Sequence, residues 1–305
     1  MEGAPKIPEE NKEKPKTSIA DKLKRWAKIG AIATVGFLPL EDAQAGDVLI
    51  NENNKAEREA KIDSLINEIK KVGNKTDLEI DDMRNAIEDA HKNYDEQKEW
   101  LKDVIGSEEY KKRLLKELDF DEKAADAYIE LRKENLNDKD YNLKFGSMIE
   151  DGVVGQYNHD DKLVHLATNP PKGREASGIH EFTHDITDGG VSISPKAEDL
   201  LTKSFNLELV KEKLGETTAA YLYSATERDA RKKVLEYDLE KLGVKKYGEE
   251  FKQEHYEKAV ELMKEGKLSA NSVEFILMTK PDYFLQIMNE IAENPNSTDE
   301  SHLKA

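Results

Sequence analysis

Two histidines and a glutamate stand close together in the run His180-Glu181-Phe182-Thr183-His184. Positions four apart lie on one face of a helix, so both histidines can aim a ring nitrogen at a single metal ion. Glu181 then lies beside that ion, where it can take a proton from an attacking water. The spacing therefore predicts a metal centre that carries out hydrolysis. The plain alternative is an ordinary helix with two packed or solvated histidines and an incidental glutamate.

A catalytic zinc site usually has a third protein ligand. Glu227 is our candidate, because it interrupts an apolar stripe on a helix predicted over residues 217–242, where an unpaired carboxylate is costly. Asp188 extends the four-residue series of the histidines and is interpreted as a helix cap or an outer group, while Asp229 is the reserve ligand. The structural alternative for Glu227 is a solvated glutamate on a charged helix.

The predicted metal helix must be positioned by the elements that precede it. Apolar residues alternate in residues 153–157 and 163–167, and turn-forming residues separate the two runs, which predicts a β-hairpin. A proline-rich breaker follows, and a helix is predicted from about Arg174 to Asp188, where glycines stop it. The sequence thus places a small sheet directly before the metal helix.

The H-E-x-x-H run and the Glu-x-x-Ala segment that begins at Glu227 together resemble the gluzincins, zinc metallopeptidases with H-E-x-x-H on one helix and a glutamate ligand on a later one. The segment is loosely similar to that of anthrax-lethal-factor-like catalytic domains and of minimal gluzincins. The similarity covers about residues 143–240 and departs at position 231, which is acidic in the lethal-factor-like pattern and arginine here. The metzincin pattern is excluded, because it requires glycine and histidine where this chain has Thr187 and Gly190.

The resemblance implies hydrolysis of peptide bonds with Zn2+ as cofactor and a peptide or protein as substrate. An edge strand, expected at residues 163–167, would hold the extended peptide by backbone hydrogen bonds. The implied roles are His180, His184 and Glu227 as metal ligands, Glu181 as general base, and Tyr223, or else Tyr221, as donor to the oxyanion. The alternative function is a non-catalytic binding or structural protein, of a virion or a cell surface, on a zincin-like scaffold.

Composition limits the fold and the partners. The chain has 305 residues, with 37% hydrophobic and 36% charged residues, which suits a soluble, helix-rich protein. Its net charge of −17 would repel a phosphate backbone, so nucleic acid is not an expected partner. Cysteine is absent, which excludes disulfides and a cysteine-ligated structural zinc. We predict an α+β fold, predominantly helical, in which a zincin-like metallopeptidase domain with a small β-sheet follows a helical hairpin region.

The first 45 residues resemble a secretory signal peptide. Residues 1–28 carry eight Lys/Arg against five Asp/Glu, an uncharged apolar stretch covers residues 29–40, and Ala43-Gln44-Ala45 matches a cleavage site. The apolar stretch is shorter than the roughly 20 residues that a membrane span needs. We therefore expect a secreted, periplasmic or cell-surface protein, with transient membrane contact through residues 22–40; a cytoplasmic or virion-associated protein is the alternative.

The remaining segments read as helices around the predicted catalytic region. In the region of residues 46–136, apolar spacing predicts helices over 52–72 and 77–105, paired as an antiparallel hairpin, and two shorter helices after them. This region is interpreted as a scaffold, or else as a module that covers the cleft or binds a partner, and His91 as a surface residue. The catalytic region is predicted over residues 137–293, with helices at about 247–264 and 271–292, the latter broken at Pro281; a disordered tail is predicted over residues 294–305.

Overall fold

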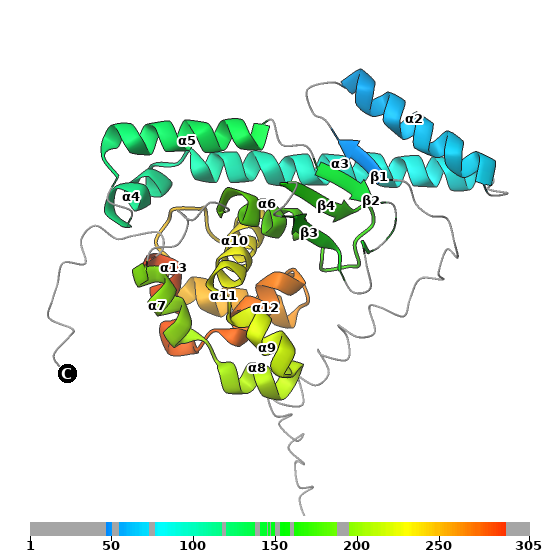
Figure 1. The fold of residues 1–305 in the computed structure, drawn as a ribbon. Helices are drawn as coiled ribbons and strands as arrows, with labels where there is room; N and C mark the ends of the chain where they lie inside the picture. Colours follow the sequence, from blue (N-terminus) through cyan, green and yellow to red (C-terminus); the bar gives the residue numbers. More distant parts are fainter. Residues whose placement is uncertain are drawn as a thin grey trace, which may run out of the picture. The chain divides into compact units, whose positions relative to one another are not determined.

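A computed structural model describes residues 47–50, 55–72, 77–117, 120–137, 141–144, 146, 148–149, 153–158, 162–187 and 195–290. It confirms a predominantly helical α+β fold (Figure 1). In chain order the elements are β1 (Asp47–Ile50), α2 (Lys55–Val72), α3 (Asp77–Ile105), α4 (Glu108–Glu117), α5 (Glu122–Asn137), β2 (Tyr141–Lys144), β3 (Gly155–Asn158), β4 (Leu163–Ala167), α6 (Ser177–Thr187), α7 (Pro195–Ser204), α8 (Leu207–Leu214), α9 (Glu216–Tyr223), α10 (Ala225–Lys241), α11 (Gln253–Lys264), α12 (Ala270–Met278) and α13 (Pro281–Glu290).

The described strands form one sheet in the order β1-β2-β4-β3. The predicted hairpin is present as the antiparallel pair β3–β4. The edge strand was predicted wrongly, because β2 pairs with the other side of β4 in parallel and places β4 inside the sheet. The edge strand of this hairpin is therefore β3.

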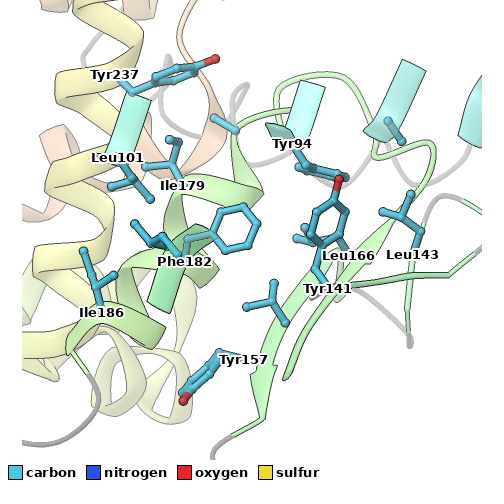
Figure 2. Packing of buried hydrophobic residues seen from close by; sticks show 14 of the residues in the cluster. Tyr94, Leu101, Tyr141, Leu143, Tyr157, Leu166, Ile179, Phe182, Ile186 and Tyr237 are labelled. Carbon is cyan, nitrogen blue, oxygen red and sulfur yellow. The ribbon is translucent and has the colours of Figure 1, made fainter. Parts of the chain in front are cut away.

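One large cluster of buried apolar side chains joins the helical region to the sheet and to α6 (Figure 2). Phe182, from inside the H-E-x-x-H run, packs edge-on against Tyr141 of β2, with 5.9 Å between the ring centroids. Leu101 and Tyr94 of α3 belong to the same cluster. The described residues between 47 and 290 fall within one compact unit.

Helix α3 supplies the N-terminal cap of α6. The first N–H groups of a helix have no partner within that helix. The fully buried Gln97 accepts a hydrogen bond from the Ile179 backbone N–H (2.9 Å) and donates one to the Glu175 carbonyl (2.8 Å). Gly178 makes this contact possible, because a Cβ there would lie 2.5 Å from the Gln97 side-chain oxygen and 2.7 Å from the Tyr94 ring. Helix α3 therefore fixes where α6 begins.

The helix predicted over residues 217–242 is two helices. Ser224 separates α9 from α10, and its ψ of 131° ends the helical backbone there. Serine is favoured at such N-terminal positions over helix interiors. The break places Glu227 in the first turn of α10. The interruption predicted at Pro281 is confirmed as the boundary between α12 and α13.

Helix α10 is buried although it is rich in charge. Every residue from Glu227 to Leu239 is buried. Lys232 and Lys233 both pair with Glu236, at 3.1 and 2.9 Å. Burying a charge is costly unless it is paired, so these ion pairs allow a charged helix to occupy the interior.

Three sequence predictions about peripheral features have different outcomes. The prediction that His91 is a surface residue is wrong, because its side chain is buried. The His91 Nδ1 atom contacts the Tyr141 hydroxyl and lies 3.1 Å from an Asp95 oxygen. No helix among the described residues is long and apolar enough to cross a bilayer. The predicted signal segment, with residues 22–40, and the predicted tail lie outside the described residues.

We expect Gln97→Leu to lower the free energy of unfolding by about 1–3 kcal/mol, because it leaves the buried Ile179 N–H without a partner, while the Glu175 carbonyl still accepts a hydrogen bond from Asn93 at 3.0 Å. Chemical denaturation measures the loss. The matched control is Gln253→Leu on the exposed face of α11, which should change stability by no more than about 0.5 kcal/mol. Equal losses in the two variants would contradict the role of Gln97 as a cap.

Candidate metal centre

The structure brings the three predicted ligands together. Helix α6 presents both histidines, and their Nε2 atoms lie 3.2 Å apart. The Glu227 carboxylate reaches them from α10, with one oxygen 3.2 Å from His180 Nε2 and the other 3.1 Å from His184 Nε2. Glu227 is only 9% exposed, so the alternative of a solvated glutamate is wrong.

These distances fit a tetrahedral metal ion. Ligand atoms about 2.0 Å from such an ion lie roughly 3.3 Å from one another, close to the spacing of the three groups. Two imidazoles and a carboxylate are also a donor set that zinc accepts. Among the residues that the structure describes, only His180, His184 and Glu227 form a group able to hold a metal. Asp229 is therefore not part of it, and Asp188 lies outside the described residues.

The environment sets the protonation of the ligands. Burial lowers the pKa of His180 to about 4 and outweighs its hydrogen bond to Glu227. Burial alone would raise the pKa of Glu227, but hydrogen bonds to the two histidines hold it well below its usual range. Burial would likewise lower the pKa of His184, yet the Glu227 carboxylate raises it. A metal ion that binds here competes with a proton at His184 rather than at His180.

Glu181 lies between the metal helix and β3. It is buried, and burial raises the pKa of its carboxyl to about 7, although the nearby His184 and a hydrogen bond from the Tyr157 backbone act in the opposite direction. A Cβ at Gly155 of β3 would lie 2.8 Å from Glu181 Cγ and 2.9 Å from a carboxylate oxygen. The absence of a side chain at Gly155 therefore leaves the space that Glu181 occupies.

The tyrosine beside the ligands is Tyr221 rather than Tyr223. The Tyr221 hydroxyl donates a hydrogen bond to Glu227, and burial together with that carboxylate raises the pKa of the hydroxyl. About half of Tyr221 is exposed to solvent. The Tyr223 ring instead packs edge-on against Phe205, with 5.4 Å between centroids. Because α9 and α10 are separate helices, the four-residue spacing between Tyr223 and Glu227 does not place them on one face.

The sequence reasoning missed a chain of ion pairs behind Glu227. Arg231 Nη1 donates to Glu227 Oε2 (2.5 Å), and Arg231 Nε donates to Glu274 Oε2 (3.0 Å). Arg174, just before α6, donates to the other oxygen of Glu274 at 2.9 Å. The available signal was the spacing of four between Glu227 and Arg231, which places opposite charges on one face of a helix. It was read only as a departure from a family pattern.

The comparisons with known proteins add no relative. No family model, no curated protein and no solved structure matches the chain. The resemblance to gluzincins therefore depends on the H-E-x-x-H run and on the geometry around it, and it stays a prediction.

Proposed function

We propose that the protein is a zinc-dependent peptidase. The observation that carries the proposal is the convergence of His180, His184 and Glu227 at the spacing of tetrahedral ligands, with a buried glutamate next to them. A bound zinc ion would polarise the scissile carbonyl and acidify water. The remaining chemistry belongs to side chains and backbone groups of this chain.

Glu181 supplies the proton transfers in this proposal. A general base works best when its pKa is near the working pH, and the pKa of Glu181 is about 7. It would take a proton from the attacking water and deliver it to the leaving amine. Tyr221 would turn its hydroxyl hydrogen from Glu227 to the oxyanion that develops on the carbonyl, the role that the sequence assigned first to Tyr223.

The position of β3 as the outermost of the described strands on its side of the sheet supports an extended peptide as substrate. The Ala167 N–H donates to the Val154 carbonyl at 3.0 Å, so ladder bonds to β4 fall on every second residue after it, at Gln156 and Asn158. The backbone groups of Gly155 consequently face the open edge. A peptide that adds to this edge would be held by backbone hydrogen bonds next to Glu181, which favours a substrate in strand conformation.

We expect Glu181→Gln to keep zinc and to lose peptide hydrolysis by about 100-fold or more, because it removes the base and no ligand. His184→Ala should lose the metal as well. Metal analysis of the purified protein and mass spectrometry of a digested peptide library measure the two properties. Glu198→Gln, on an exposed position of α7, is the matched control and should change neither. Full hydrolysis by Glu181→Gln would overturn the mechanism, and zinc without any hydrolysis in the unaltered protein would favour the non-catalytic alternative.

We expect Gly155→Ala to retain zinc and lower kcat by about 100-fold, because the added methyl group would displace the Glu181 carboxylate by a large part of an ångström or more. Steady-state kinetics and zinc content of the same preparation provide the measurement. Gln156→Ala, at the neighbouring exposed position of β3, controls for a general disturbance of the strand. An unchanged kcat in Gly155→Ala would show that the position of Glu181 does not limit the reaction.

A further inference from the structure

We infer that Arg231, itself held by Glu274, is the residue that orients the Glu227 carboxylate for the metal. The inference rests on the proposed zinc site and concerns how that site is kept in order. It assigns a positioning role to Arg231 and Glu274, two residues outside the H-E-x-x-H run.

The contacts of Arg231 restrict both ends of Glu227. Arg231 Nη1 donates to the Glu227 side chain at 2.5 Å and to its backbone carbonyl at 3.1 Å. The side chain of Arg231 is only 6% exposed, so water and salt screen these contacts little. A planar guanidinium held at two points of one residue fixes the direction of that residue, which a flexible ammonium group does less well.

One of the two histidines, His180, lacks among the described residues the orienting contact that metal-binding histidines usually have. A metal-binding histidine almost always donates its second ring N–H to a carboxylate, a carbonyl or water. His180 Nδ1 is buried and has no hydrogen-bond partner in the part of the chain that the structure describes. Arginine at position 231 cannot accept that hydrogen bond, because its guanidinium only donates. The contacts of Arg231 place an orienting interaction on the carboxylate ligand.

Glu274 resolves the electrostatic conflict that Arg231 would otherwise create. A guanidinium beside a metal ligand repels a divalent cation, but the Glu274 carboxylate at 3.0 Å balances its charge. Arg174 donates to the second oxygen of Glu274 at 2.9 Å and so links the start of α6 to α12. The ion pairs thereby connect the two helices that carry ligands through a third helix.

For Arg231→Gln, the change in charge and the loss of positioning predict opposite changes in zinc affinity. Arg231→Gln removes a cation and leaves Glu274 in place, so charge alone would tighten zinc binding. Loss of orientation would weaken it instead. Glu274→Gln should weaken binding on both grounds, because it frees the guanidinium and leaves its charge unbalanced.

The test is the zinc dissociation constant of the full chain, measured by competition with a chromogenic chelator. We expect Arg231→Gln and Glu274→Gln to bind zinc about tenfold to a hundredfold more weakly than the unaltered protein. Arg231→Lys should recover part of the loss, because its ammonium group can still donate a hydrogen bond to Glu227, although without the rigid fork of the guanidinium. Arg228→Gln is the matched control: it removes another buried arginine of α10, one that bonds Ser204 rather than a metal ligand, and it should keep the original affinity.

A spectroscopic measurement separates positioning from general instability. The visible spectrum of the Co2+-loaded protein reports ligand geometry, and it should change in Arg231→Gln and Glu274→Gln but not in Arg228→Gln. Zinc binding by Arg231→Gln that is as tight as in the unaltered protein, with an unchanged cobalt spectrum, would overturn the inference. An unaltered protein that binds no zinc would instead overturn the proposed function on which the inference rests.

Discussion

The carboxylate of Glu227 has to remain ionised in a place that is almost closed to water, and the surrounding structure meets that requirement. Two imidazoles face its oxygens at 3.1 and 3.2 Å, and a guanidinium contacts it from behind at 2.5 Å. An isolated carboxylate in the interior would take up a proton or turn outward. The positions of α6 and α10, which supply these partners, are therefore tied to one another through a single side chain.

The rest of α10 also holds ionisable side chains in the interior of the protein, where each needs a hydrogen-bond or ion-pair partner. Asp238, for example, accepts hydrogen bonds from the Ser269 backbone (2.9 Å) and the Ser272 hydroxyl (2.7 Å) at the start of α12. Paired buried charges add little net stability, but removing one partner is strongly destabilising. Such pairs favour one packing arrangement over others, and a site that needs sub-ångström placement of a carboxylate benefits from a helix held in this way.

Local sequence patterns predicted the parts of the structure that local interactions determine. The H-E-x-x-H helix, the β3–β4 hairpin and the break at Pro281 follow from periodicity and from breaker residues. Glu227 was found because a carboxylate stood out on an apolar stripe. The parallel pairing of β2 with β4 places β4 inside the sheet. Because this pairing joins segments that are distant in the sequence, no local sequence pattern predicts it. The burial of α10 and His91 was likewise hidden, because charged and polar side chains read as solvated until their partners are known.

The cap that Gln97 gives to α6 comes from a residue 82 positions earlier in the chain. The H-E-x-x-H motif is consequently not a self-contained module. A fragment that starts after α5 would keep every proposed ligand and yet lack the group that completes the first turn of the ligand helix. Recombination of this region into another protein would have to carry α3 along. The same dependence means that the first turn of α6 is complete only where two segments 82 positions apart in the chain lie in contact.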